Sequence, residues 1–414
     1  MSRVSLRDRI KASVISRRWN EICLSPSRIQ LHWHQGLVNV ANCDRYEHFC
    51  PMYRDAFVNN VNRFLASFRG NHVRYFHLRF CLTSSSKDDI DEWIRFAIRM
   101  GVKVMGVVLY CQTGTGSALR TLDDDDSELS FEDDQYVMGA ELFDTAQCNL
   151  KCLQLCGCNL RPDFAKYVSA LKSLSLCLSF LAQYDLQTML SGLPRLVDLL
   201  FDTCTLPQEL SLSCLPSLKK FRIKYCRGVE QIYLSNVNLV FLSILGKRAI
   251  KGNLVGAPNL KTFCCSATSL TMPSLFKRIP EEAPMLETFC VSYCGKSDDC
   301  VPNCLKVFNG VTRLEWYFLE RSRLGIAKMI RNTKNLEEHN LVPVNYKPEH
   351  LTFVALRGFD GASGQIDFVL YLLEHAVMLK QLAIVSAKSW GEGAQQDFLS
   401  KIQGLREDVE VTVR

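Results

Sequence analysis

Residues 196–204 read Leu-Val-Asp-Leu-Leu-Phe-Asp-Thr-Cys, a nine-residue pattern from which the fold can be predicted. Apolar residues stand at its first, fourth and sixth positions, and a cysteine stands at its ninth. With an aromatic or another aliphatic residue allowed at a Leu position, the same pattern recurs along the chain. The copies are Leu150–Cys158, Leu196–Cys204, Leu218–Cys226 and Leu286–Cys294. Repetition of this kind predicts an array of similar small units rather than one compact domain.

The apolar triplet also recurs without the cysteine, at Leu171-Leu174-Leu176, Leu239-Leu242-Ile244 and Leu260-Phe263-Cys265. The units from residue 150 to residue 286 start 21 to 26 residues apart, which is the spacing of leucine-rich repeats. Each such repeat supplies one short strand and packs on its neighbours. We therefore predict an α/β fold: a leucine-rich-repeat solenoid with a curved parallel sheet and irregular helices and loops on the convex side.

The series continues towards the C-terminus with less regularity. The later units are Val311-Leu314-Trp316, a degraded Leu336-His339-Leu341, Leu351-Val354-Leu356 and Leu379-Leu382-Ile384. Helices are expected at residues 365–376 and 395–402, with a last strand at 409–413. Near the N-terminus, helical periodicity predicts a helix over residues 53–68 and a second helix capped by Asp88 or Asp89. Strands are expected after them, near residues 73–78 and 102–107.

Composition limits the possible classes of protein. The chain has 414 residues, 47% of them hydrophobic, and a formal net charge of +6. This length exceeds one ordinary compact domain, but a solenoid has no such limit. The mild charge and the absence of a dominant basic, aromatic-interleaved stretch argue against nucleic-acid binding. No apolar run approaches the roughly 18 residues that a membrane span needs.

Nineteen cysteines could indicate a disulfide scaffold, but three observations argue for free thiols. The number is odd, the N-terminus has no apolar signal segment, and four cysteines occupy the ninth repeat position. A thiol at that position can sit under the strand-to-turn corner and donate to a neighbouring backbone carbonyl. Reduced thiols predict a cytoplasmic or nuclear protein.

Five segments are expected along the chain. Residues 1–28 are basic and form a short amphipathic helix, and residues 29–111 form helix–strand repeats. Residues 112–148 hold an acidic insertion loop and its connection, because eight carboxylates between Asp123 and Asp134 repel one another. Residues 149–345 carry the leucine-rich repeats, and residues 346–414 form a distinct C-terminal region.

Two segments resemble a known family. Residues 7–23, RDRIKASVISRRWNEIC, resemble the second half of a plant F-box. Residues 350–385, HLTFVALRGFDGASGQIDFVLYLLEHAVMLKQLAIV, resemble the FBD domain that ends many plant F-box/LRR proteins. The chain is thus similar to F-box/FBD/LRR-repeat proteins. Since no residues precede Met1 to supply the opening L-P-x-x-x-L helix, we expect an N-terminally truncated F-box.

The resemblance implies a function without chemistry of its own. In this family the F-box docks on a Skp-type adaptor, which links it to the cullin of an SCF ubiquitin ligase, and the repeats hold a protein target. The expected adaptor contacts are Ile10, Val14, Ile15 and Trp19. Two alternatives stay open: a ligase-independent repeat scaffold or decoy, and a small-molecule receptor. The four apolar residues could also pack only on the first repeat.

The pleat of the strands predicts which side chains face a target, because alternate residues point away from the core. The expected target-binding residues are Asp198, Asp202, Lys220, Arg222, Lys224 and Phe241, with Leu200, Ser243 and Leu245 beside them. They could form a charged recognition patch or a self-neutralising, solvated face.

Candidates for chemistry are weak. Cys152, Cys156 and Cys158 lack a nearby histidine, and His32-x-His34 lacks a third ligand for zinc. Gly114-x-Gly116 lacks the glycine that opens a dinucleotide-binding helix. We therefore predict no catalytic site, no metal and no cofactor.

Overall fold

The computed structural model describes a defined set of residues. They are 27–32, 53–109, 135–144, 148–181, 183–234, 237–246, 251–253, 257–267, 283–293, 310–318, 348–387, 390–402 and 405–414. The chain divides into two compact units. The first comprises Met1–Leu210, Cys214–Leu218 and Cys226–Val229; the second comprises Ser211–Ser213, Lys219–Tyr225 and Glu230–Arg414. The acidic block, Cys294 and Leu336-His339-Leu341 lie outside the described residues.

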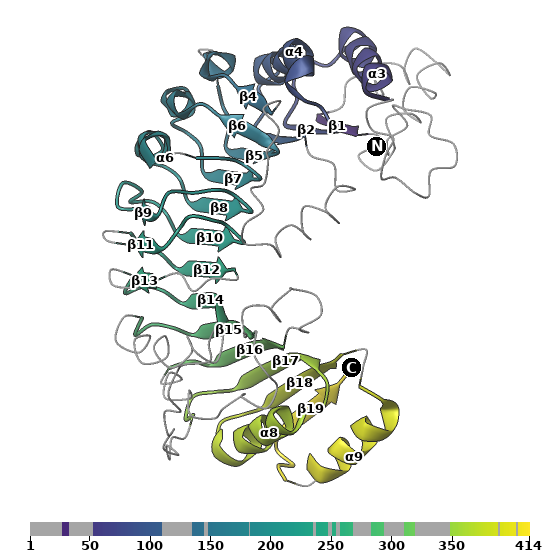
Figure 1. The fold of residues 1–414 in the computed structure, drawn as a ribbon, viewed down its shortest axis with the longest axis vertical. Coiled ribbons are helices and arrows are strands. Elements are labelled where there is room, and N and C mark those ends of the chain that lie inside the picture. The colour runs from purple at the N-terminus through teal and green to yellow at the C-terminus, as the bar shows by residue number, and fades with distance from the viewer. Residues whose placement is uncertain are drawn as a thin grey trace, which may run out of the picture. The chain divides into compact units, whose positions relative to one another are not determined.

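The first unit is a series of parallel strands in which spatial order follows chain order (Figure 1). Each strand pairs with the next one without a shift in register. The strands are β1 (Arg28–His32), β2 (Tyr75–Arg79), β3 (Val104–Val108), β5 (Cys152–Cys156), β7 (Ser173–Cys177) and β8 (Asp198–Asp202). This arrangement confirms the predicted α/β class and the leucine-rich-repeat type.

Helices cover one side of these strands in the first unit, where α4 and α6 are seen in Figure 1. The helical segments are α3 (Arg54–Ala66), η3 (Ser84–Ser86), α4 (Lys87–Arg99), η5 (Ala140–Phe143), η6 (Pro162–Lys166) and α6 (Gln183–Ser191). Apolar residues at helical spacing, such as Ile90, Trp93 and Ala97 of α4, are buried against the sheet. Both predicted N-terminal helices are therefore confirmed; α3 begins one residue later and ends two residues earlier than predicted.

The predicted cap of α4 is wrong. Ser86 occupies the N-cap position, and no side chain caps the helix. Asp88 and Asp89 lie inside the first turn, where a negative charge favours the helix dipole without accepting the first amide hydrogens. Asp89 instead accepts a hydrogen bond from Asn62 Nδ2 of α3 at 2.7 Å.

Among the described residues of the first unit, one charged side chain is buried. Asp91 of α4 is 3% exposed and forms an ion pair with Lys87. It also accepts a hydrogen bond from the Tyr136 hydroxyl at 2.5 Å, and Tyr136 is itself 1% exposed. Tyr136 opens β4 (Tyr136–Met138), which pairs in parallel with β6 (Cys158–Leu160). The hydrogen bond between Tyr136 and Asp91 therefore holds β4 against α4, within residues 112–148 that the sequence predicts as an insertion loop and its connection.

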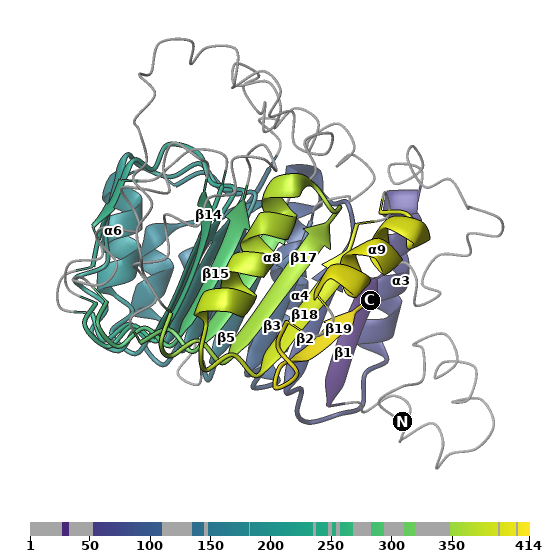
Figure 2. The ribbon, with the colours of Figure 1, turned by 90° about the horizontal axis from the view of Figure 1, so that it is seen from below.

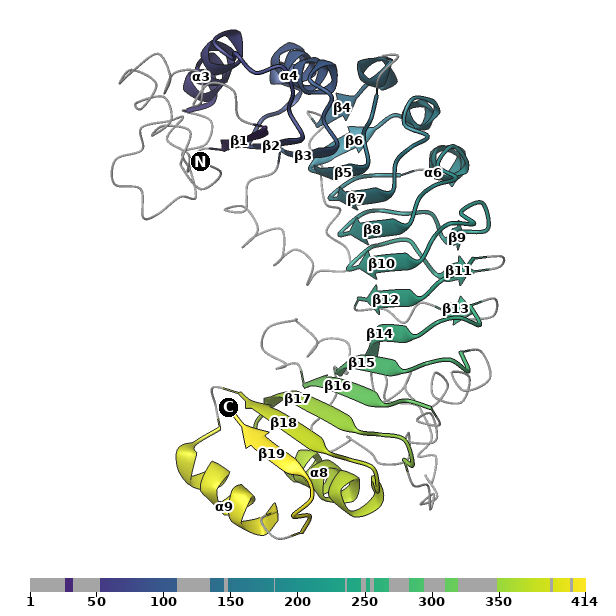
Figure 3. The same ribbon diagram turned by 180° about the vertical axis from the view of Figure 1, so that it is seen from behind.

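The second unit repeats the parallel arrangement. Its strands also follow chain order and pair in parallel. They are β10 (Lys220–Lys224), β12 (Phe241–Leu245), β14 (Thr262–Ala267), β15 (Thr288–Tyr293), β16 (Arg313–Phe318), β17 (Phe353–Phe359), β18 (Gln381–Ser386) and β19 (Glu410–Val413). Two short strands, β11 (Gln231–Tyr233) and β13 (Lys251–Asn253), pair beside them (Figure 3). A further short strand, β9, spans Glu209–Ser211.

The apolar repeat positions form the core. The first residue of each described repeat is at most 4% exposed, and the fourth and sixth are also buried in most repeats, as at Leu199 and Phe201. The buried first residues are Leu150, Leu171, Leu196, Leu218, Leu239, Leu260, Leu286, Val311, Leu351 and Leu379. The repeat pattern thus predicted the core correctly across both units.

The residue that follows a strand in the first unit turns the chain sharply. It has a positive φ in three successive repeats: Gly157 (68°), Leu178 (53°) and Thr203 (53°). Only glycine adopts this region without cost, so the repeat geometry imposes the turn on the leucine and the threonine.

Two helices, α8 (Ser363–His375) and α9 (Glu392–Ile402), lie with β17, β18 and β19 in the C-terminal part of the second unit (Figure 2). Phe359 packs against Trp390 and Phe398, with ring centroids 4.9 and 5.4 Å apart. Gly358 and Gly361 flank it with φ of 71° and 80°, and a Cβ at Gly361 would lie 2.4 Å from Trp390 Nε1. The Gly-Phe-x-Gly stretch is therefore explained by its backbone conformation and by the aromatic rings that pack against it.

Candidate interaction surface

Half-buried and buried residues alternate along the strands, and the former define what we call the open face of each unit. In β8, Leu199 and Phe201 are buried while Asp198, Leu200 and Asp202 are half-buried. Since neighbouring parallel strands are in register, the open-face residues of successive strands form rows across the sheet. Residues within one row lie about 4.8 Å apart, from strand to strand, and offer side chains to another molecule.

The predicted acidic residues lie on the open face of the first unit, at the two ends of β8. Asp202 accepts a hydrogen bond from Thr203 Oγ1 at 3.0 Å. Burial raises the pKa of the Cys152 thiol, and the negative charge of Asp198 adds to that shift. The role of the two aspartates in target binding stays a prediction.

The predicted basic residues lie on β10, in the second unit. Lys220 is exposed, and Arg222 and Lys224 are half-buried. Phe241 lies opposite Lys220 on β12 and is half-buried. Ser243 was expected on the open face, but it is only 4% exposed; in its row it lies between Arg222 and Cys264. The assignment of these residues to a target also stays a prediction.

A different set of open-face residues in the first unit forms what we call the basic patch: Arg28 of β1 with Tyr75, His77 and Arg79 of β2. The Arg28 guanidinium carbon lies 4.1 Å from the centre of the Tyr75 ring. The rings of Tyr75 and His77 are nearly parallel, with centroids 6.2 Å apart. The patch therefore combines two permanent cations, one histidine and one aromatic ring on neighbouring strands.

The basic patch disfavours a further positive charge. Burial lowers the pKa of His77 below its ordinary value, and the charges of Arg79 and Arg28 lower that pKa further. The imidazole ring lies over the next strand, since a Cβ at Gly106 would be 2.4 Å from His77 Cδ2. His77 is thus held flat across β3, with two arginines close to it.

The second unit contains a similar group of residues with one important difference. We call this group the paired cluster: Arg313, Glu315 and Tyr317 of β16 with Phe353 and Arg357 of β17. Arg313 stacks on Phe353 at 4.0 Å and forms an ion pair with Glu315 at 2.8 Å. The Tyr317 hydroxyl donates to the same carboxylate at 3.1 Å, and Arg357 lies 5.6 Å from the Tyr317 ring. Burial and Glu315 together raise the pKa of Tyr317.

Among the described cysteines of the ninth repeat position, Cys158 and Cys204 are buried and Cys226 is half-buried. Cys204 is 1% exposed, and its Sγ donates to the Leu176 carbonyl of the preceding repeat at 3.4 Å. Ser179 stands at the same position one repeat earlier and donates to the Cys158 carbonyl at 2.8 Å. Burial raises the pKa of Cys158 to about 12. These thiols are structural hydrogen-bond donors rather than reactive thiolates.

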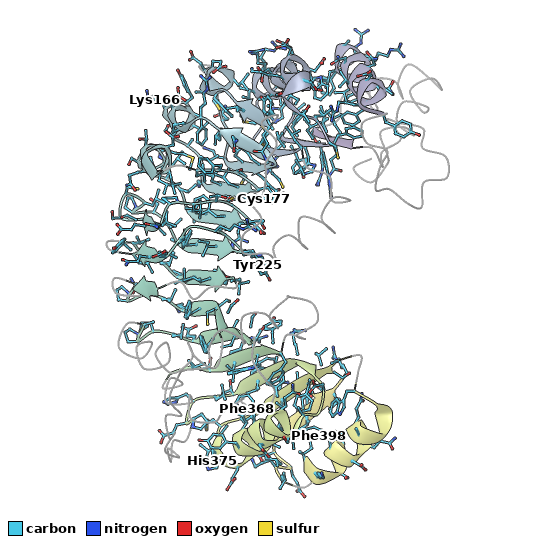
Figure 4. All side chains as sticks on the ribbon, viewed as in Figure 1. Lys166, Cys177, Tyr225, Phe368, His375 and Phe398 are labelled. Carbon is cyan, nitrogen blue, oxygen red and sulfur yellow. The ribbon has the colours of Figure 1, made fainter. Side chains whose placement is uncertain are left out.

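Other thiols lie opposite each other on neighbouring strands. Cys156 and Cys177 are such a pair in the first unit, and Cys264 and Cys290 are one in the second. The hydrogen bond that Cys156 and Cys290 each donate to the partner thiol, together with burial, raises the pKa of both residues. Figure 4 labels Cys177 at the end of β7, and Lys166 on the helical side of the same unit. Among the described residues, no group of three or more His, Cys, Asp or Glu side chains could hold a metal ion.

The four expected adaptor contacts, Ile10, Val14, Ile15 and Trp19, lie outside the described residues. The basic patch, by contrast, was missed in the sequence. Tyr75-x-His77-x-Arg79 is a polar alternation on an expected strand, and it could have been noticed. Arg28 carries no such signal, because it ends the basic N-terminal segment, residues 1–28, and no strand is predicted there from the sequence.

The family follows from a comparison with known proteins. Residues 64–302, more than half of the chain, match the family described as At1g61320/AtMIF1, LRR domain. The chain belongs to this leucine-rich-repeat family. Residues 349–384 of this repeat protein also match the FBD family. The predicted resemblance to plant F-box/FBD/LRR-repeat proteins is thereby confirmed.

Two relatives from Arabidopsis thaliana support the same conclusion for this leucine-rich-repeat protein. F-box/FBD/LRR-repeat protein At1g13570 is 28% identical over 212 residues, which cover 47% of this chain and 39% of that protein. Putative F-box/LRR-repeat protein At5g54820 is 23% identical over an alignment that covers 91% of this chain and 85% of the relative.

An alignment with the crystal structure of the Rad7 and Elc1 complex in yeast covers 98% of this repeat protein and 96% of that chain. Its sequence identity is 12% and its TM-score is 0.30, which is too low to establish a shared fold. In the part of the chain that the structure describes, no helix is long and apolar enough to cross a membrane.

Proposed function

We propose that this leucine-rich-repeat protein binds a protein target on its open face and presents that target to an SCF-type ubiquitin ligase. The observation that carries the first half is the alternation of the strands. Their buried residues face the helices, while the opposite rows expose charged, polar and aromatic side chains in register. Rows of this kind suit recognition of an extended surface.

The second half rests on the family. Both relatives carry the F-box in their names, and residues 7–23 resemble half of that module. The proposed partners are a Skp-type adaptor and, through it, a cullin. The protein would contribute proximity, because holding a target beside a ubiquitin carrier raises its effective concentration there. This role places the protein in the cytoplasm or the nucleus.

Co-purification tests the link to the ligase. The full chain, at micromolar concentration, should retain a Skp-type adaptor, and Trp19→Ala should abolish the retention. Tyr167→Ala is the matched control, because it removes an exposed aromatic side chain from another part of the chain. If the intact chain retains no adaptor, the ligase-independent scaffold replaces this proposal.

Photo-crosslinking tests the binding face. A photoreactive amino acid at Gln154, exposed on the open face of β5, should crosslink to a discrete protein in plant extract. The same amino acid at Arg63, exposed on α3, should not crosslink to it. Crosslinks from Arg63 but not from Gln154 would place the target on the helical side and refute the proposal.

A further inference from the structure

The basic patch stands on a part of the open face where the described strands carry no carboxylate. Among the described residues, the open-face positions of β1, β2, β3, β5 and β7 carry no aspartate or glutamate. The first carboxylates on this face are Asp198 and Asp202 of β8, four strands away from β2. At about 4.8 Å per strand this separation is about 19 Å, well beyond the screening length of about 8 Å at physiological ionic strength.

The arginines of the basic patch keep donors available for a partner. Stacking covers one face of the Arg28 guanidinium, but its N–H groups point outward in the plane of the group. Hydrogen bonds and ion pairs within the described part of the chain include none donated by the Arg28 or Arg79 guanidinium. A carboxylate is the group that such a planar donor set recognises in a bidentate manner.

The spacing of the basic patch selects the shape of the ligand. Tyr75, His77 and Arg79 are alternate residues of one strand, so their rows lie about 6.6 Å apart and span about 13 Å. An extended peptide projects every second side chain to the same side with the same period. Because Gly106 carries no side chain, the His77 ring rests on the backbone of β3. No side chain of residue 106 therefore projects from the sheet beside the patch.

We infer that the basic patch binds an extended acidic segment of a partner protein, with carboxylates at alternate positions facing Arg28, His77 and Arg79. The inference rests on the proposed function, since it names the chemistry of the target. A nucleic acid fits less well: high-affinity sites of that kind neutralise about 6–10 phosphates, whereas the patch offers two permanent charges. Gly106 acts as a positioning residue that sets the place of His77.

Fluorescence polarisation with the full chain tests this inference. The probe is a labelled peptide that alternates glutamate and serine, and the control peptide has glutamine in place of glutamate. The first should bind at low ionic strength and the second should not. Arg28→Gln with Arg79→Gln should weaken binding at least about tenfold, in line with the loss of two charge-assisted contacts.

A matched charge control separates a built site from diffuse attraction. Arg63→Gln with Arg99→Gln removes the same charge from exposed positions of α3 and α4, and it should change the affinity less than about twofold. Equal weakening by both double variants would overturn the inference. Stronger binding of a single-stranded oligonucleotide of the same charge would also overturn it and assign the patch to nucleic acid.

Two further measurements distinguish a failure of the acidic ligand from a folding defect and from a failure of the proposed function. Because Arg28 is exposed, Arg28→Gln alone should fold normally and show part of the loss, and thermal unfolding checks this. The crosslinks from Gln154 are then repeated in the double variant. If the peptide never binds but those crosslinks appear and persist, the acidic ligand is wrong and the proposed function stands. If the wild type gives no crosslinks from Gln154, the proposed function itself fails.

Discussion

The basic patch and the paired cluster use the same contact and reach different electrostatic results. In both, an arginine stacks on an aromatic ring of the next strand, at 4.1 Å for Arg28 on Tyr75 and 4.0 Å for Arg313 on Phe353. In the second, Glu315 accepts from the arginine and from a tyrosine hydroxyl. One carboxylate therefore makes the difference: where it is present, it accepts the hydrogen bonds of the arginine, and where it is absent, the arginine keeps its donors for another molecule.

The largest expected effects lie in the core, where the two units should not differ. Phe201→Ala in the first unit and Phe289→Ala in the second each remove a fully buried ring. Each should lower the free energy of unfolding by about 3–5 kcal/mol, measured by denaturant titration. Thr288→Ala, half-buried beside Phe289, should change it by less than about 0.5 kcal/mol. A small loss at either phenylalanine would show that the two cores are not equivalent.

The buried aspartate of the first unit should give the next largest effect. Tyr136→Phe removes the hydroxyl that donates to Asp91 and leaves one carboxylate oxygen without that donor. The free energy of unfolding should fall by about 1.5–3 kcal/mol, because the lost hydrogen bond is to a charged group. Tyr233→Phe is the control, since that hydroxyl donates to Gln231 at the surface. An equal effect of the two substitutions would contradict the role assigned to Asp91.

Gln30→Glu should convert the basic patch into something closer to the paired cluster. Gln30 lies opposite His77, so the new carboxylate raises the pKa of His77, which is now lowered by burial and by two arginines. The pKa of His77 is lower in the folded wild-type protein than in the unfolded chain, so the unfolded chain binds the proton more tightly. The free energy of unfolding therefore falls as the pH drops below 6.5. The variant should reduce that loss, and histidine proton chemical shifts report the pKa directly.

The same variant should bind the acidic peptide several-fold more weakly, since the new charge competes for the arginines. Gln154→Glu places a carboxylate on the open face two strands from His77, and it should have a smaller effect. If Gln30→Glu leaves both the pKa and the affinity unchanged, the patch does not depend on the absence of a carboxylate.

Glu315→Gln makes the opposite change and should have the smallest effect. It removes an ion pair with partly exposed Arg313, so the free energy of unfolding should fall by about 0.5–1 kcal/mol. The pKa of Tyr317 should fall as well, because the carboxylate helps burial to raise it. Ultraviolet absorbance titration against the wild type measures that shift. Glu287→Gln breaks an exposed pair with Lys261 and should leave the Tyr317 pKa unchanged.

The repeats could be predicted well from the sequence, because the spacing of each apolar triplet is enough to show which of its residues are buried. It failed where distant segments meet. Arg28 and Tyr75 lie 47 residues apart, and nothing in either stretch shows that β1 and β2 come into register. Asp91 accepts a hydrogen bond from Tyr136, 45 residues later in the chain, and the helical pattern around Asp91 does not show this contact. The periodicity of a strand shows which side chains leave the core, but not which neighbours they find.

The buried thiols of the repeats allow local opening of the chain to be measured. Cys158, Cys204 and Cys265 are buried at known places along the series of repeats. A thiol-alkylating reagent can reach each one only when its own repeat opens, so the rate of labelling at each cysteine measures local opening there. Peptide mass mapping of labelled protein would then read the stability of the array repeat by repeat, without any engineered probe.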